Sequence, residues 1–313
     1  MASERRVWAA LVAVWVIWGS TYLAIRWTVE TIPPFLSAGV RHLVVGSILY
    51  AVMRLRGEAA PDRRAWGVAA VVGTALLFGG NGLVSWAEQR VPSGLTALII
   101  AVVPVEIVLF AWLWPRRTDA VPRPSPAIFA GLALGVAGVL VLAGPSTILG
   151  AGGADLVGAA VLVLATTSWA AGSVWSRRHA VSVSPFLLVG MQSLAGGVAC
   201  IAAGLATGEA SQVDAADFTP RAVGSLAYLV VFGSLVAYTC YVWLLQHAPP
   251  ARVATYGFVN PVVAVALGWL LAGETLSWRV ALAAGLILAA VLLVLRAPSP
   301  SGPVKAVPAE EAA

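Results

Sequence analysis

Ten apolar stretches follow one another along the chain, each near the roughly 20 residues needed to span a bilayer, with short polar connections between them. The pattern predicts transmembrane helices at residues 7–25, 34–53, 66–86, 92–114, 127–144, 156–175, 185–206, 221–244, 253–272 and 279–296. Pro104 and Pro261 fall in mid-segment. Because a membrane helix tolerates proline when its neighbours satisfy the freed carbonyl group, we expect these prolines to mark kinks and not helix ends. The pattern predicts an all-α membrane protein.

The second half of the chain repeats the first. An offset of 151 residues aligns identical residues without a gap: Trp18 with Trp169, Pro34 with Pro185, Phe35 with Phe186 and Gly46 with Gly197. A second offset, of 157, does the same for residues 86–112 and 243–269. Each half holds five predicted helices, and because five is odd, the second copy must enter the bilayer from the opposite side. The sequence therefore predicts two inverted five-helix repeats, residues 7–144 and 156–296, followed by a disordered cytoplasmic tail at 297–313.

Composition and charge agree with a membrane location, since 60% of the residues are apolar and 11% are charged. Placing the N-terminus in the cytoplasm assigns 14 of the 19 lysines and arginines to the inside and four to the outside, and the remaining one, Arg41, lies within a predicted helix. The loop 208–220 then lies outside, and it carries three acidic residues and no basic one. We expect a protein of the bacterial inner membrane with both termini in the cytoplasm. The net charge of +5 follows from this topology and does not indicate a nucleic-acid partner.

Several activities lack the residues they need. The single lysine, Lys305, follows no glycine-rich phosphate loop and lies in no predicted helix, which argues against an ATP-driven pump and a retinal protein. The three histidines and two cysteines are widely separated, so they indicate neither a metal site nor a disulfide. No Gly-x-Ser-x-Gly element indicates a serine hydrolase. We expect no enzymatic activity, no cofactor and no metal.

Three strings carry a specific family resemblance. They are WGSTYLAIRWTVETIPPFLSAGVRHLVVG, GGNGLVSWAEQRVPSGLTALIIAVVPVE and ARVATYGFVNPVVAVALGWLLAGETLSW, and they resemble the EamA family of the drug/metabolite transporter superfamily. The resemblance covers roughly residues 7–296. It implies ten helices as two repeats around a central cavity, alternating access, and export of small metabolites such as amino acids or drugs. It does not imply one substrate. Glu106 departs from the family pattern, which implies an apolar residue shortly after Pro104.

The expected function is therefore secondary transport. We predict an inner-membrane exporter of small metabolites, such as amino acids or amphipathic and drug-like compounds, with protons as a candidate coupling ion. The partners are a small-molecule substrate and the lipid bilayer, and the protein is a monomer or a dimer. An uncoupled facilitator or an importer is the alternative within this class. A membrane enzyme or a channel is the alternative from other classes.

Glu106 is the candidate proton-coupling residue, because an ionisable group inside the bilayer is expensive and by default functional. Desolvation disfavours the charged form of a carboxyl group, so proton exchange near neutral pH becomes accessible. An ion pair with Arg41 or hydrogen bonding is the structural alternative, and binding of a cationic substrate is a third. Counting the helical rise from the outer ends puts Arg41 at a depth of roughly 10 Å and Glu106 at roughly 21 Å, which strains a direct pair.

Polar and aromatic residues deep in the predicted helices are the candidates for substrate binding. Trp18 and Trp169, which are repeat mates, lie near mid-membrane, whereas most of the 13 tryptophans lie near helix ends. Depth counting predicts two layers of deep polar groups. Nearer the outer face lie Arg41, His42 and Asn81, and nearer the inner face lie Glu106, Gln192, Tyr238 and Asn260. Gln192 is the repeat mate of Arg41, and Tyr238 is that of Asn81. Helix packing, capping and lipid contact are the alternative roles. The candidates are Trp18, Tyr22, Arg41, Asn81, Trp169, Gln192, Tyr238 and Asn260.

Overall fold

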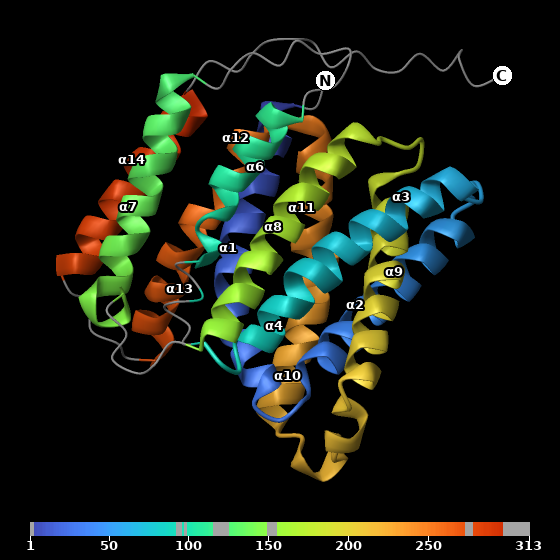
Figure 1. Cartoon of the computed structure of the whole chain (residues 1–313). Coiled ribbons are helices and arrows are strands. Elements are labelled where there is room, and N and C mark those ends of the chain that lie inside the picture. The colour runs from blue at the N-terminus through green and yellow to red at the C-terminus, as the bar shows by residue number, and fades with distance from the viewer. Residues whose placement is uncertain are drawn as a thin grey trace, which may run out of the picture.

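The computed structural model describes residues 3–91, 96, 99–114, 125–148, 155–272 and 278–296. These residues form helices and turns without a strand, which confirms the predicted all-α class (Figure 1). Six helical runs in the described chain are long and apolar enough to cross a membrane. They are α1 (Glu4–Val29), α2 (Pro34–Leu55), α3 to α4 (Arg63–Ala87), α8 (Leu156–Arg178), α9 (Pro185–Ala206) and α10 to α11 (Pro220–His247).

Further helices lie in the other four predicted spans. They are α6 (Val103–Leu113), α7 (Pro126–Ile148), α12 (Pro250–Ala254) with α13 (Tyr256–Ala272), and α14 (Trp278–Arg296). Most helices begin or end within a few residues of the predicted apolar run, and capping side chains mark where several of them begin. The side chains of Asp62, Asp155, Ser184 and Thr219 each accept a hydrogen bond from a backbone N–H of the following helix. The predicted tail at 297–313 and residues 92–95 of the fourth span lie outside the described residues.

Pro104 corrects one expectation. Residues 101–102 form a turn and α6 begins at Val103, so Pro104 lies in the first turn of a helix and not at a kink within one. A proline there leaves no intrahelical hydrogen bond unmade, because the first N–H groups of a helix have no partner within it. Pro261 does lie inside its helix, α13.

Two helical runs contain π-helical segments that the sequence did not indicate. η1 (Thr74–Gly82) joins α3 (Arg63–Gly73) to α4 (Leu83–Ala87), and η4 (Leu229–Tyr238) joins α10 (Pro220–Tyr228) to α11 (Thr239–His247). The 157-residue offset places η1 on residues 231–239, so the two segments occupy nearly equivalent positions in the two halves. A π-helical turn adds a residue to the helical repeat and is frequent at functional sites.

The contact between α2 and α9 follows the internal repeat. A Cβ atom on Gly46 would lie 2.7 Å from the backbone nitrogen of Leu194, and one on Gly197 would lie 2.9 Å from that of Leu43. The 151-residue offset converts the first contact into the second. Gly39 with Ile201 and Gly190 with Tyr50 form a second such pair. The order of these contacts makes α2 and α9 antiparallel, and glycine lets the two backbones approach closely.

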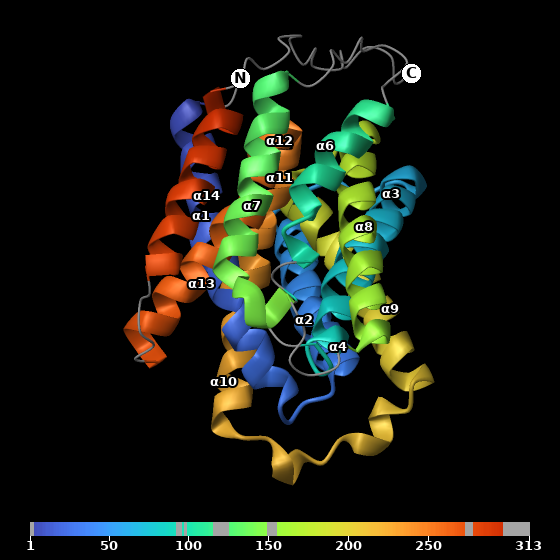
Figure 2. The same cartoon turned by 60° about the vertical axis from the view of Figure 1, so that its left-hand side comes forward.

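The ends of the helices define the two ends of the bundle. The start of α1 and the end of α14 lie at one end (Figures 1 and 2). We call the other end the loop end, because the connection with the short helices η2 (Glu209–Gln212) and η3 (Ala215–Asp217) lies there, shown in gold. The Glu209 carboxylate accepts hydrogen bonds from the backbone N–H groups of Phe35 and Leu36, at 3.2 and 2.9 Å. It thereby fixes this connection to the start of α2.

Candidate functional site

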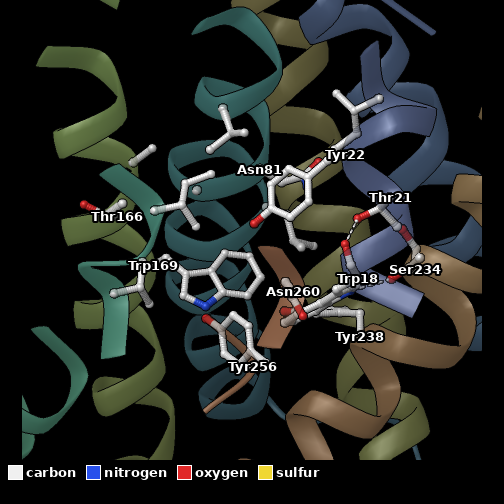
Figure 3. Close-up of a pocket in the computed structure, with 18 of the residues that line it drawn as sticks. Trp18, Thr21, Tyr22, Asn81, Thr166, Trp169, Ser234, Tyr238, Tyr256 and Asn260 are labelled. Carbon is white, nitrogen blue, oxygen red and sulfur yellow. Dashed lines mark hydrogen bonds between the residues drawn. The ribbon is translucent and has the colours of Figure 1, made fainter. Parts of the chain in front are cut away.

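A cavity lies among the helices of both halves, with about 740 Å³ of space between protein atoms, a volume that includes space open to the solvent. Its lining includes residues of α1, α2, η1, α8, η4 and α13 (Figure 3). On α1 the lining begins at Trp18 and continues toward the C-terminal end of the helix. On α2 it consists of Arg41 and His42, which lie in the N-terminal half of that helix. The cavity therefore extends from the middle of the bundle toward the loop end. Its lining combines aromatic rings with a few polar side chains, as small-molecule sites do.

Aromatic rings form one side of this cavity. Trp18 and Trp169 pack edge to face, with ring centroids 5.4 Å apart. Trp18 also packs against Tyr241 and Tyr256, at 5.0 and 5.1 Å. The Trp18 Nε1–H donates to the carbonyl oxygen of Gly233 at 3.1 Å, and that of Trp169 donates to the Tyr241 hydroxyl at 3.0 Å. Because both indole N–H groups have partners, the rings are held in place, and Figure 3 shows Trp18, Trp169 and Tyr256 around one space.

Arg41 is the charged group of the cavity. Its side chain is 5% exposed, and its Nε donates to the Ser234 hydroxyl at 2.6 Å. Its Nη1 donates to the Asn81 side-chain oxygen at 3.3 Å. Both partners are neutral, and the two ion pairs of the described residues, Arg90–Asp155 and Arg252–Glu4, do not involve Arg41. A guanidinium group thus lines the cavity without a carboxylate partner from the described chain.

The repeat mates of Arg41 and Asn81 also form a pair. The Tyr238 hydroxyl donates to the Gln192 side-chain oxygen at 2.8 Å, and the two offsets convert the Arg41–Asn81 contact into this one. Gln192 is fully buried and does not line the cavity, whereas Tyr238 does. Gln192 therefore orients Tyr238 and has no access to a molecule in the cavity.

Glu106 lies behind the cavity wall and not in it. Its Oε1 accepts hydrogen bonds from the hydroxyls of Thr167, at 3.0 Å, and Thr166, at 3.4 Å. Its Oε2 is buried and has no partner among the described residues. Thr166 lines the cavity, so one hydroxyl separates Glu106 from it. The structural alternative for Glu106 is thus hydrogen bonding to two threonines, and no ion pair with Arg41 forms.

Comparisons with known proteins assign the chain to a family. The model of the EamA-like transporter family matches residues 6–144 and 156–296, which coincide with the two predicted repeats. This chain belongs to the EamA-like transporter family. The inner membrane transporter YedA of Escherichia coli K12 is 40% identical over 92% of this chain and 90% of its own length. The transporter YvbV of Bacillus subtilis is 27% identical over 87% of this chain and 85% of its own length.

A solved crystal structure supports the fold. It aligns with 94% of this EamA-like chain and 98% of its own chain, with a TM-score of 0.74 and 20% sequence identity. At that identity the likeness concerns the fold alone. The family is named for transporters, and YedA and YvbV are named as transporters, so the comparisons indicate transport and not an enzymatic activity.

The structure brings most of the candidate residues of this EamA-like chain to one place. Seven of the eight candidates for substrate binding line the cavity, and Gln192 does not. Residues from both predicted layers meet there, because helices of the two halves face each other across the same space. The seven are Trp18, Tyr22, Arg41, Asn81, Trp169, Tyr238 and Asn260.

Several lining residues escaped the sequence reasoning. Thr21, Thr166 and Ser234 carry small hydroxyls, which are frequent in membrane helices and therefore carry little signal. Tyr256 lies near the start of a predicted helix, where a tyrosine is expected at the membrane interface. Within the structure, however, α13 begins at Tyr256 beside the Trp18 ring. Only the contact with Trp18 and Tyr241 reveals its place in the cavity wall.

Glu88, which follows the third long helical run, also escaped notice. Its Oε2 is buried without a partner among the described residues. Burial raises the pKa of this carboxyl group to about 8, although the positive charge of Arg26 opposes the shift. Tyr22, which lines the cavity, lies within the electrostatic reach of Glu88. The group is therefore mostly protonated at neutral pH.

A pH dependence of stability follows from Glu88. Because its pKa is higher in the folded protein than the ordinary 4.5, the folded state holds the proton more tightly. The resulting stabilisation is full below about pH 4.5 and is lost by about pH 8. From pH 5 to pH 9, we expect the melting temperature of the wild type to fall by at least about 3 °C more than that of Glu88→Gln. Parallel curves for the two proteins in detergent would contradict this assignment.

Proposed function

We propose that this chain is an inner-membrane secondary transporter that exports a small metabolite by alternating access. The observation that carries the proposal is the cavity in the middle of the bundle, to which both halves contribute a tryptophan, Trp18 and Trp169, and polar side chains. Fixed aromatic surfaces with a few convergent polar groups are typical of small-molecule sites. Amino acids and amphipathic or drug-like compounds fit such a lining. Trp18, Tyr22, Arg41, Asn81, Trp169, Tyr238 and Asn260 would contact the cargo, with Gln192 behind Tyr238.

We further propose that ten helices form two inverted five-helix repeats. Three observations support this arrangement: the antiparallel contacts of α2 and α9 that the repeat exchanges, the equivalent positions of η1 and η4, and the equivalent pairs Arg41–Asn81 and Tyr238–Gln192. In an inverted repeat, exchanging the conformations of the two halves turns a cavity that faces one end into one that faces the other. The aromatic cluster around Trp18 would open in that exchange.

Glycines between the outer helices are suited to such a movement. Gly131 and Gly138 of α7 lie against Val294 and Ile287 of α14, and Gly135 lies against Phe258 of α13. α7 and α14 lie side by side at one edge of the bundle (Figures 1 and 2). Because these contacts are apolar, the helices can shift against one another without breaking side-chain hydrogen bonds.

Proton coupling through Glu106 is part of the proposal. The free Oε2 atom can take up a proton, while Oε1 keeps its contact with Thr166 at the cavity wall. A cargo that displaces the Thr166 hydroxyl changes the hydrogen bonding of the carboxylate and so its affinity for a proton. This gives the coupling between cargo and proton that an antiporter needs.

The orientation can be tested by cysteine labelling. With both termini in the cytoplasm, the loop end with its acidic connection faces the periplasm, and so does the cavity. In a background without Cys200 and Cys240, we expect Asp214→Cys to react with a membrane-impermeant maleimide added to intact cells. Ala60→Cys, in the connection before α3, should react only after the membrane is opened. Labelling of both positions from outside would overturn the assigned topology.

Counterflow in proteoliposomes tests the carrier function itself. Vesicles with the purified chain are loaded with one unlabelled compound from a panel of amino acids, organic acids, sugars and nucleobases, and entry of the labelled compound is followed. Faster entry caused by the internal compound demonstrates a carrier, because a channel gives no such acceleration. If a folded sample accelerates no compound and instead conducts ions, the carrier proposal is overturned.

A further inference from the structure

We infer that Arg41 and His42 form a binding site for the carboxylate group of the cargo, so that the cargo is a small monocarboxylic acid with a flat or bulky apolar body. This inference rests on the proposed function and names the substrate class of the same cavity. It follows from the partners of the two side chains, from the charge of the cavity wall and from the position of the aromatic rings.

Arg41 supplies the charge for this site. A buried guanidinium group ordinarily has an anionic partner, since the desolvation of an unpaired charge is strongly unfavourable. Here its Nε and Nη1 donate to Ser234 and Asn81, which are neutral and which hold the side chain in one orientation. The planar guanidinium fork matches a carboxylate better than any other cation in proteins does. The fixed and unneutralised cation is thus prepared for an anionic group that enters the cavity.

His42 provides a second, independent observation. The side chain is 1% exposed and lines the same cavity as Arg41. Neither ring nitrogen makes a hydrogen bond of good geometry to a described residue, although the Asn81 side chain lies nearby. Buried polar atoms are rarely left without a partner in native proteins. If Arg41 binds one oxygen of a carboxylate, a ring N–H of His42 can donate a hydrogen bond to the second oxygen and thereby gain a partner.

The charge of the cavity wall limits the anion to a single charge. Arg41 is the only permanently charged residue among the described residues that line the cavity. One guanidinium group neutralises a monocarboxylate, whereas a phosphate dianion would leave net negative charge in a surrounding of low dielectric constant. A cationic compound would be repelled by Arg41 at the same place. Among the candidate cargoes, this argues against cationic drugs.

The aromatic rings fix the rest of the cargo. Trp18 and Trp169 line the same cavity as Arg41, and Trp18 donates its N–H to Gly233, next to the Ser234 that holds Arg41. Gly233 lies so close to Arg41 that a Cβ there would be 3.1 Å from its Nη2. The charged and aromatic parts of the wall are therefore adjacent. A molecule with a carboxylate next to a ring or a bulky apolar group can contact both at once.

Pairs of acids and their neutral amides test this site on the full chain in lipid nanodiscs. Indole-3-acetate with indole-3-acetamide and phenylacetate with phenylacetamide have nearly the same shape within each pair but differ in charge. By titration calorimetry, we expect the acids to bind at least about tenfold more tightly than the amides, as a charge-assisted hydrogen bond predicts. Equal affinities within both pairs, or no binding of either acid to a folded sample, would overturn the inference.

Three variants assign the preference to residues. Arg41→Gln should abolish the preference for the acid and leave the weak binding of the amide unchanged. His42→Phe, which keeps a ring of similar shape, should reduce the preference. Arg26→Gln removes an exposed arginine of the same half that does not line the cavity, and it should keep the wild-type preference. If Arg41→Gln does not fold, the affinities of the acids and amides for the wild type and for His42→Phe still test the site. A preference that survives in both cavity variants would overturn the site.

Transport measurements separate this inference from the proposed function. Selective binding of acids without counterflow of any compound would leave the carboxylate site standing and overturn the carrier function. Counterflow of amides as fast as of acids would support a carrier and overturn the carboxylate site. Counterflow of the acids alone, lost in Arg41→Gln and kept in Arg26→Gln, is the result expected if both are correct.

Discussion

Replacement of Gly73 by alanine is expected to lower the free energy of unfolding by about 3 kcal/mol, near the upper end of the range for overpacked cores. A Cβ atom at this position would lie 2.1 Å from the carbonyl oxygen of Gln192 and 2.9 Å from its carbonyl carbon. These atoms belong to the backbone of α9, so no rotation of a side chain can relieve the clash. The end of α3 and the start of η1 must move away from α9, which also disturbs the Tyr238–Gln192 pair.

Gly67→Ala is the matched control in the same helix. Gly67 is exposed, and a Cβ atom there would meet nothing within 4 Å. Alanine is the better helix former, so this change should stabilise the protein by up to about 1 kcal/mol. Thermal unfolding of both variants in the same detergent compares them directly. Similar melting temperatures for Gly73→Ala and Gly67→Ala would show that the close approach of α3 and α9 does not exist.

Much of the fold follows from the sequence because the bilayer allows few solutions. Backbone groups in lipid must be satisfied within a helix, so each long apolar run becomes one, and predicted boundaries such as 34–53 and 185–206 differ little from α2 and α9. The break before Pro104 and the π-helical segments could not be predicted in this way. They depend on how neighbouring helices pack, and hydropathy does not record packing.

The site was partly predictable for a related reason. A charged or amide side chain is costly in lipid, so Arg41, Asn81 and Asn260 stand out against the apolar residues around them. The repeat added a further signal, since the mates of Arg41 and Asn81 form the equivalent contact in the other half. Hydroxyl groups such as those of Thr21 and Ser234 carry no comparable cost. Whether such a hydroxyl binds Arg41 or lines the cavity depends on which face of its helix points inward, and only the assembled bundle shows this.

The largest functional effect is expected for Glu106→Gln. Glutamine keeps the size of the side chain and can still accept hydrogen bonds from Thr166 and Thr167, so cargo exchange between the two sides should continue. It cannot bind and release a proton, however. A coupled antiporter with this change should therefore lose its response to a proton gradient while it retains counterflow.

The measurement uses proteoliposomes with and without an imposed pH gradient, and a compound that passes the counterflow test. In the wild type the gradient should drive accumulation of the cargo, and in Glu106→Gln accumulation should fall to the level reached without a gradient. Glu30→Gln is the control, because it removes an exposed carboxyl group that neither lines the cavity nor contacts Thr166. Gradient-driven accumulation that persists in Glu106→Gln would leave Glu106 with a structural role at the two threonines, because a group that cannot change its proton occupancy cannot couple it to transport.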